Sequence, residues 1–245
     1  MTFPQVMPLT GERTVPGIWH ENYWFARHEA AYRWLTGLGL PSGRRVLEAG
    51  CGEGYGAGLL AAAGAAAVLG LDYDTAAIRH VHKRYAIPCV QGNLVQTGFA
   101  DDSFDLVVSL QTIEHLWEQP RFVTECRRVL RPDGTLVVST PNRLTFPSGN
   151  WYHTRELTGP ELVELTRAEF GNVETFGLWH GPRLTAWDEA NGSCVDAQLA
   201  ADADEWSIEL QALVRSVRHT DFTIRASRDT ADLDGSLDLI VLARA

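Results

Sequence analysis

The sequence lacks any long apolar run. The longest one, from Leu59 to Leu71, is interrupted by Gly64 and Gly70, whereas a membrane-spanning helix needs about 20 consecutive apolar residues. The N-terminus also lacks the basic start and the apolar segment of a secretory signal. We therefore expect a soluble, cytoplasmic protein with no membrane span.

Cysteines and basic residues are few. Cys51, Cys89, Cys126 and Cys194 form no Cys-x-x-Cys pair and no Cys/His cluster, which argues against a disulfide framework and a structural zinc site. Lys and Arg number 21 against 31 Asp and Glu, giving a net charge of −10. Because nucleic acid is bound by concentrated basic surfaces, we expect no nucleic-acid partner, and a neutral or cationic small ligand fits better.

The sequence does contain a regular alternation of short apolar runs and helical segments. Hydrophobic residues make up 45% of the 245 residues, enough for one well-buried core. Five strands are predicted between residues 44 and 142, at 44–50, 67–74, 87–93, 104–110 and 135–142. Strands that are buried on both faces and joined by helices are typical of a parallel sheet covered by helices.

Two further strands are predicted at 172–179 and 237–245, and helices at about 22–36, at 157–170 and within 181–221. The long excursion before the last strand suggests a hairpin pair at one edge of the sheet. We therefore predict an α/β fold with a Rossmann-like, seven-stranded sheet that is mostly parallel, has an antiparallel edge strand and carries helices on both faces.

The sharpest motif is E-A-G-C-G-E-G-Y-G at residues 48–56, where the first strand leads into a helix. Glycines in such a turn let the backbone bend tightly and lie against a ligand. Read from Gly52, the motif also passes as a dinucleotide fingerprint, with Asp72 at about the distance expected for a ribose contact. A plain strand-to-helix turn that holds no ligand is the third interpretation.

Charge separates the two ligand classes. A dinucleotide would bring its pyrophosphate to this turn, where Glu48 and Glu53 would repel it. S-adenosylmethionine has no phosphate, and its ammonium and sulfonium groups suit a carboxylate-rich pocket. Asp72 could accept hydrogen bonds from both ribose hydroxyls, and Asn93, at the end of the third strand, could meet the adenine amino group. These residues favour S-adenosylmethionine over NAD.

These motifs together resemble the class I S-adenosylmethionine-dependent methyltransferases. The resemblance rests on E-A-G-C-G-E-G-Y-G, LDYD, GNL, FDLVVSLQTIEHL and RVLRPDGTLVVSTPN, within residues 44–142, and it implies that family's sheet and S-adenosylmethionine as the cofactor. Asn93 departs from the family, which more often has Asp at this position. The predicted cofactor-binding residues are Glu48, Gly50, Cys51, Gly52, Gly54, Asp72, Tyr73, Asn93, Leu94 and Gln111.

A narrower resemblance extends over nearly the whole chain. The segments LTGERTVPGIWHENYWFARHEAAY, STPNRLTF, HTREL and GLWHGPRL are similar to actinobacterial methyltransferases of methylmannose polysaccharide and methylglucose lipopolysaccharide biosynthesis. This resemblance implies an O-methyltransferase whose partner is a saccharide acceptor, with the methyl group going to a sugar hydroxyl of a partly methylated mannoside or glucoside.

A sugar hydroxyl is a poor nucleophile, so its methylation calls for a general base near the ends of the fourth and fifth strands. The predicted catalytic residues are His153, then His115 with its neighbour Glu114, while His180 ranks third. For each histidine, a purely structural role is the alternative. The predicted substrate-binding residues flank the same cleft and are Tyr23, Trp24, Trp151, Tyr152, His180 and Arg183.

We predict a single domain over residues 1–245. It would comprise an N-terminal aromatic cap (1–40), a cofactor-binding core (44–142), acceptor-side loops and helices (143–221) and the last strand (236–245).

Several alternatives stay open. Mg²⁺ held by Glu114 and an acid from residues 188–204 is compatible with the sequence, but no ligand spacing requires it. The acceptor could instead be a small phenol, a quinone or a lipid head group, because fold does not determine substrate. A non-catalytic cofactor-binding protein and an NAD-dependent enzyme are further alternatives, and the sequence leaves a homodimer open.

Overall fold

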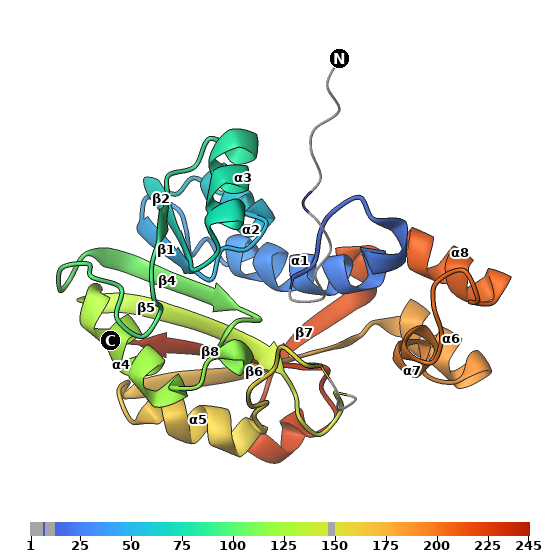
Figure 1. Cartoon of the computed structure of the whole chain (residues 1–245). Helices are drawn as coiled ribbons and strands as arrows, with labels where there is room; N and C mark the ends of the chain where they lie inside the picture. The colour runs from blue at the N-terminus through green and yellow to red at the C-terminus, as the bar shows by residue number, and fades with distance from the viewer. Residues whose placement is uncertain (1–6, 8–12, 147–149) are drawn as a thin grey trace.

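Eight strands form one continuous sheet in the computed structural model (Figure 1). The structure describes residue 7, residues 13–146 and residues 150–245. The order of the strands across the sheet is β3-β2-β1-β4-β5-β8-β6-β7. Their bounds are β1 (Arg45–Ala49), β2 (Ala67–Asp72), β3 (Cys89–Gln91), β4 (Phe104–Leu110), β5 (Leu130–Pro141), β6 (Asn172–His180), β7 (Phe222–Ala226) and β8 (Asp238–Arg244).

Eight α-helices are found in the described part of the chain. They are α1 (Asn22–Gly37), α2 (Tyr55–Ala62), α3 (Thr75–Tyr85), α4 (Gln119–Val129), α5 (Gly159–Arg167), α6 (Pro182–Asn191), α7 (Cys194–Leu199) and α8 (Ile208–Ser216). No helix among these residues is long and apolar enough to cross a membrane.

The predicted Rossmann-like α/β fold is confirmed, but the prediction of seven strands is wrong. The additional strand is β7, which pairs antiparallel with β6 and forms one edge of the sheet. β8 is also antiparallel, yet it lies inside the sheet between β5 and β6. The physical reason is burial: Asp238–Ala243 of β8 are all buried, as an interior strand covered on both faces requires.

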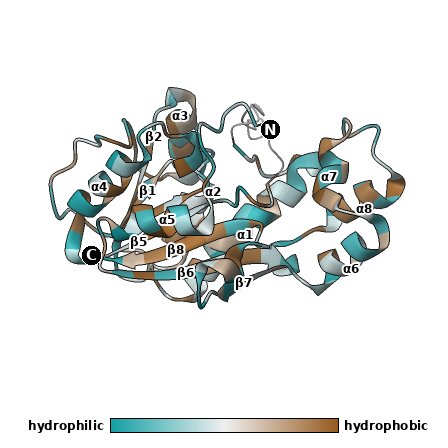
Figure 2. Cartoon of the chain, turned by 90° about the horizontal axis from the view of Figure 1, so that it is seen from below, coloured by the Kyte–Doolittle hydropathy of each residue, from teal (hydrophilic) through white to brown (hydrophobic). Residues whose placement is uncertain are grey.

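The core consists of two apolar layers, one on each face of the sheet. Helices α1, α2 and α3 cover one face, and α4 and α5 cover the other (Figure 1). Successive residues of β8 alternate between the layers, with Ile240 in the first and Val241 in the second, because side chains of a strand point to opposite faces. In Figure 2 the apolar colouring is visible on β5 and β8 and on parts of helices such as α3 and α8.

Helices α6, α7 and α8 form a lobe beyond β7 (Figure 1), within the range where helices were predicted. The lobe is joined to the sheet through α1, whose Asn22 side chain donates hydrogen bonds to the main-chain oxygens of Val214 and Val217 at the end of α8. This contact holds the lobe against the N-terminal helix.

Candidate functional site

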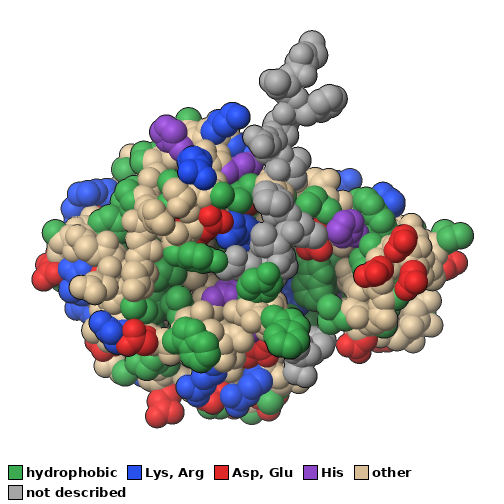
Figure 3. Space-filling view, viewed as in Figure 1, with side chains coloured by type: hydrophobic (Ala, Val, Ile, Leu, Met, Phe, Trp, Pro, Cys, Tyr) green, Lys and Arg blue, Asp and Glu red, His purple; other side chains and the backbone are tan. Residues whose placement is uncertain are grey.

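Two adjoining cavities lie at the carboxyl ends of β1, β2, β4 and β5. The inner cavity is lined by the glycine loop after β1 and by the ends of β2 and β4. The outer cavity, of about 590 Å³, lies between α1 and the loops after β4 and β5. A histidine side chain is visible near the middle of this face, with large hydrophobic side chains close by (Figure 3). The residues that line both cavities are Arg13, Thr14, His28, Gln111 and His115.

The glycine loop has a backbone that side chains would obstruct. Gly50 and Gly54 have φ angles of +86° and +93°, which L residues rarely adopt. A Cβ atom on Gly50 would lie 2.5 Å from the Thr112 side chain, and one on Gly54 would lie 2.5 Å from Val81. The loop can therefore approach β4 and α3 closely and expose its main chain to the inner cavity.

Glu48, at the end of β1, is buried beneath this loop. Its Oε1 accepts a 2.7 Å hydrogen bond from the Tyr32 hydroxyl, while its Oε2 is buried without a hydrogen-bond partner among the described residues. Burial raises the pKa of Glu48 to about 8. A buried polar atom that lacks a partner is uncommon, and a cation held above the loop would compensate this carboxylate.

Asp72 ends β2 with its carboxylate held by the main chain. Its Oδ2 accepts a 2.8 Å hydrogen bond from the Gly52 N–H, and its Oδ1 accepts one of 2.9 Å from the Asp74 N–H. Each carboxylate oxygen can accept more than one hydrogen bond, so both remain able to receive a pair of hydroxyl groups. The geometry thus fits a ribose at the inner cavity, which Asp72 lines.

Glu53 has a different environment from the one that the charge argument assumed. Its Oε1 accepts a 2.7 Å hydrogen bond from His80 Nε2, and its Oε2 accepts one of 2.7 Å from the Tyr85 hydroxyl. Arg84 lies 3.5 Å from the same carboxylate. Because α3 supplies these partners and Glu48 is buried behind the loop, the repulsion of a pyrophosphate falls mainly to Asp72, which lines the inner cavity.

Most of the predicted cofactor-binding residues meet at the inner cavity. Those that line it are Gly50, Cys51, Gly52, Asp72, Tyr73, Leu94 and Gln111. Glu48 and Gly54 support the loop from behind without lining the cavity. Asn93 does not line it either, because its side-chain oxygen accepts a 3.0 Å hydrogen bond from the Val95 N–H within a turn. Leu94, its neighbour, faces the cavity instead.

The N-terminal segment before α1 covers part of the inner cavity. Arg13 forms a 2.7 Å ion pair with Asp74, which follows β2. The Thr14 hydroxyl lies 3.0 Å from the Tyr55 hydroxyl at the start of α2. These two contacts hold residues 13 and 14 across the glycine loop, and Glu12, the other half of the TGER motif, lies outside the described residues.

His153, in the loop after β5, is oriented by two polar neighbours. Its Nδ1 donates a 2.7 Å hydrogen bond to Glu156. The Asn150 Oδ1 accepts a hydrogen bond from the Tyr152 N–H, so its Nδ2 is the group that donates to His153 Nε2, at 3.1 Å. The proton of a neutral His153 therefore sits on Nδ1, and Nε2 carries the lone pair that a base needs.

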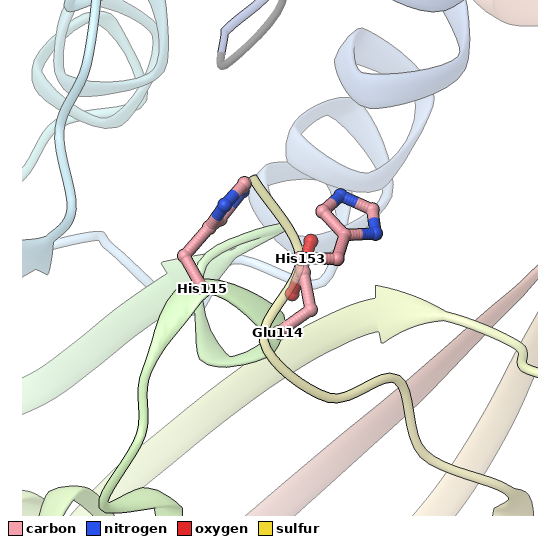
Figure 4. A group of neighbouring side chains, drawn as sticks. All are labelled: Glu114, His115 and His153. Atoms are coloured by element: carbon pink, nitrogen blue, oxygen red, sulfur yellow. The ribbon is translucent and has the colours of Figure 1, made fainter. Parts of the chain in front are cut away.

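His115 and Glu114 follow β4 in a short 3-10 helix, η2 (Ile113–His115). His115 Nδ1 donates a 2.9 Å hydrogen bond to the main-chain oxygen of Tyr152, and its ring lies 4.9 Å from that of His153, edge to face. Figure 4 shows the two imidazoles with the Glu114 carboxylate between them. Glu114 accepts a hydrogen bond from Thr140, and burial raises its pKa to about 8.

His28, on α1, is a third imidazole at this site that the sequence analysis missed. It lines both cavities, and its Nδ1 lies 3.3 Å from the Tyr55 hydroxyl. Burial lowers the pKa of His28 to about 4, so the ring is neutral at pH 7. Its position on α1 carries no distinct signal in the sequence, because a helix that faces a cavity has the same periodicity as one that faces a core.

The ligand atoms of Glu114, His115 and His153 all lie within 4.8 Å of one another. This set offers one carboxylate and two imidazoles, and no acid from residues 188–204 belongs to it. Mg²⁺ prefers a shell of oxygen ligands, whereas imidazole suits transition metals. The cluster therefore does not fit the magnesium site that the sequence left open.

The predicted substrate-binding residues divide into two groups. Trp24, Trp151 and Tyr152 line the outer cavity. Tyr23 and His180 do not line it. The Tyr23 hydroxyl is hydrogen-bonded to His180 Nε2 at 2.6 Å, and His180 Nδ1 is hydrogen-bonded to Asp188 at 2.7 Å. These bonds link α1, β6 and α6. Arg183 also lies away from the cavity and forms a 2.7 Å ion pair with Asp221.

Comparison with known proteins agrees with this geometry. The family model described as "Methyltransferase domain" matches residues 47–138. The chain is 49% identical to a "Probable S-adenosylmethionine-dependent methyltransferase" of Mycolicibacterium smegmatis, covering 98% of this chain and 96% of that protein. It is 48% identical to a protein of the same description from Mycobacterium tuberculosis, covering 98% of this chain and 90% of the other.

Solved structures show the same fold. An S-adenosylmethionine-dependent methyltransferase from Thermotoga maritima superposes with a TM-score of 0.63 at 16% identity, covering 91% of this chain and 92% of that one.

Proposed function

Because this chain belongs to the class I S-adenosylmethionine-dependent methyltransferases, we propose that it methylates a hydroxyl oxygen of an uncharged saccharide. The observation that carries the proposal is the outer cavity, where aromatic side chains adjoin imidazoles that reach the boundary with the inner cavity. Aromatic rings stack on the apolar faces of sugars, and neutral imidazoles accept hydroxyl protons. The similarity of STPNRLTF and HTREL to enzymes of polymethylated polysaccharide biosynthesis supports a mannoside or glucoside.

The residues of the inner cavity would hold the methyl donor. Asp72 would accept the two ribose hydroxyls, Glu48 would compensate the ammonium charge from behind the glycine loop, and Leu94 would pack against the adenine. When bound, the donor supplies an electrophilic methyl group on a sulfonium. The unpartnered Glu48 oxygen and the exposed main chain of the glycine loop fit such a cationic ligand, which brings no phosphate to the turn.

His153 would act as the general base in the outer cavity. Its Nε2 would take the hydroxyl proton while the oxygen–methyl bond forms and the sulfur–methyl bond breaks in line. Glu156, hydrogen-bonded to Nδ1, would stabilise the resulting imidazolium. His115 lies at the boundary of the two cavities and would orient the acceptor oxygen.

The acceptor class can be tested with a defined panel. Purified protein and S-adenosylmethionine would be incubated with methyl mannosides and glucosides, with partly methylated derivatives and with simple phenols, and methyl transfer would be followed by mass spectrometry. Product on the glycosides alone supports the proposal. Product on the phenols alone would assign the protein to a phenol or quinone acceptor, and binding of the donor without any product would favour the non-catalytic alternative.

A further inference from the structure

The outer cavity continues into a groove between α1 and the lobe. This tryptophan groove, of about 550 Å³, is lined mainly by Trp19, Trp24, Trp206, Gln198, Asp202 and Asp204. Glu21, Trp24 and Leu199 line both the groove and the outer cavity. A long ligand whose reacting end lies at His153 could therefore extend past Trp24 into the groove.

One residue of the groove lining carries a buried acceptor without a partner. Gln198 is only 5% exposed; its Nε2 donates to the main-chain oxygen of Cys194, while its Oε1 is buried without a partner among the described residues. Buried polar atoms without a partner are uncommon in folded proteins. Because Gln198 lines the groove, a ligand in the groove lies beside the residue that carries this unpartnered acceptor.

Contacts within the protein hold Trp19 and Trp206 in place. The Trp206 indole N–H donates a 2.9 Å hydrogen bond to the main-chain oxygen of Ala201. The Trp19 ring packs edge to face on Trp206 at 5.9 Å, and the Arg215 guanidinium lies 3.6 Å from the centroid of the Trp19 ring. Rings fixed in this way lose little side-chain freedom when a ligand stacks on them.

We infer that the tryptophan groove is a second acceptor subsite, which binds a sugar unit one or more positions away from the unit that is methylated. This inference rests on the proposed function and deepens it, because it assigns an uncharged oligosaccharide as the preferred acceptor. A single phenol or quinone ring would occupy the outer cavity alone and leave the groove unused.

The chemistry of the lining selects this ligand class. Glu21, Asp202 and Asp204 would repel an acceptor that carries phosphate, sulfate or carboxylate groups. An alkyl chain could pack on the tryptophans but would leave Gln198 Oε1 unsatisfied. A neutral sugar offers both an apolar ring face for the indoles and hydroxyl donors for the oxygen atoms.

The test measures how methylation depends on acceptor length. The probes are methyl glycosides of α-linked manno- and gluco-oligosaccharides of one to four units, and kcat/KM is obtained from the formation of S-adenosylhomocysteine. We expect kcat/KM to rise at least about tenfold, the equivalent of one well-packed ring, between one unit and three. Trp206→Ala should remove this rise, and Trp206→Phe, which keeps a ring, should retain most of it.

Ile208→Ala is the matched control. Ile208 is 82% exposed at the start of α8 and does not line the groove. The dependence of kcat/KM on acceptor length in this variant should therefore equal that of the parent protein.

The outcomes separate this inference from the proposed function. If single-unit glycosides are methylated as efficiently as longer ones, the subsite is refuted and saccharide methylation stands. If Trp206→Ala lowers kcat/KM equally at every length, Trp206 is merely structural and the subsite is again refuted. If no glycoside of any length is methylated, the proposed function itself fails.

Discussion

At the scale of single residues, His153 has the features of a base whose proton is fixed at the correct nitrogen. Its Nδ1 is bound to Glu156 and its Nε2 faces Asn150, whose amide an acceptor hydroxyl would displace. We expect His153→Ala to lower kcat by about 10²–10⁴-fold, the usual contribution of a general base. Calorimetry should show unchanged affinity for S-adenosylmethionine, because His153 does not line the inner cavity.

Glu156→Gln is the companion variant for this prediction. The amide can still accept the hydrogen bond from Nδ1 but carries no charge to stabilise an imidazolium, so its loss of kcat should be smaller than that of His153→Ala. Near-normal turnover of His153→Ala would remove His153 from the role and transfer the prediction to His115 and His28, which line both cavities.

Glu48 makes cofactor binding dependent on pH. Burial raises the pKa of its carboxyl to about 8, so in the free protein it is mostly protonated at pH 7. An ammonium group nearby would favour the carboxylate, and binding should therefore release nearly one proton per cofactor at pH 7 and strengthen as the pH rises toward 8. Calorimetry in buffers of different ionisation enthalpy measures this number.

Glu48→Gln supplies the control, because its amide cannot release a proton. If the variant releases as many protons as the parent protein does, the released proton comes from another group and the assignment of Glu48 is wrong.

At the scale of elements, a buried ion pair joins α1 to β8. Arg27 Nε and Nη2 donate to the two carboxylate oxygens of Asp238 at 2.9 and 2.5 Å, and both side chains are almost fully buried. Arg27→Met would leave the Asp238 charge unpaired, so we expect a loss of about 3–5 kcal/mol in the free energy of unfolding. Urea denaturation measures this loss.

The double variant Arg27→Met/Asp238→Asn tests the cause. Removing both charges should recover a large part of the lost stability. A double variant as unstable as Arg27→Met would show that the packing of the Arg27 side chain, and not the unpaired charge, dominates.

The strands differ in how far the sequence could predict them. The runs that became β1, β4 and β8 are strongly apolar because both faces of each strand are buried, and all three were predicted. The β7 segment, FTIRA, is five residues long and mostly not buried, so its apolar pattern is too weak to mark a strand. The place of β8 between β5 and β6 depends on long-range pairing, which no local pattern contains.

The candidate site shows a similar division. Motif spacing identified the glycine loop and Asp72, since these lie on consecutive strand ends that a parallel sheet must bring together. The tautomer of His153 depends on Glu156 and Asn150, and the side chain of Asn93 is turned into a local hydrogen bond; neither follows from spacing. His28 escaped prediction because its role depends on how α1 packs across the loops.

At the scale of the whole molecule, buried acids should make stability fall with rising pH near neutrality. Burial raises the pKa values of Glu48 and Glu114 to about 8, whereas in the unfolded chain they ionise near 4.5. Between about pH 4.5 and 8 the folded protein binds more protons than the unfolded chain at these two groups, so each group lowers stability by up to about 1.4 kcal/mol per pH unit as the pH rises. Above pH 8 the decrease should level off.

Histidine opposes this trend only at lower pH. Burial lowers the pKa of His28 to about 4, so between about pH 4 and 6.5 the unfolded chain binds the extra proton at this residue, which offsets about half of the decline that the two acids cause there. Urea denaturation from pH 5 to 9 should therefore show its steepest decline between 6.5 and 8. The double variant Glu48→Gln/Glu114→Gln should flatten that decline, and an unchanged slope would assign it to other groups.

The contacts of Arg13 and Thr14 across the glycine loop have a consequence for the timing of turnover. Arg13 and Thr14 line the inner cavity, so opening of the ion pair between Arg13 and Asp74 would widen the way out for a spent cofactor. Because that pair is partly exposed, dissolved salt screens it. Ionic strength would then act as an accelerator of cofactor exchange, and in dilute buffer each enzyme molecule would keep its spent cofactor longest.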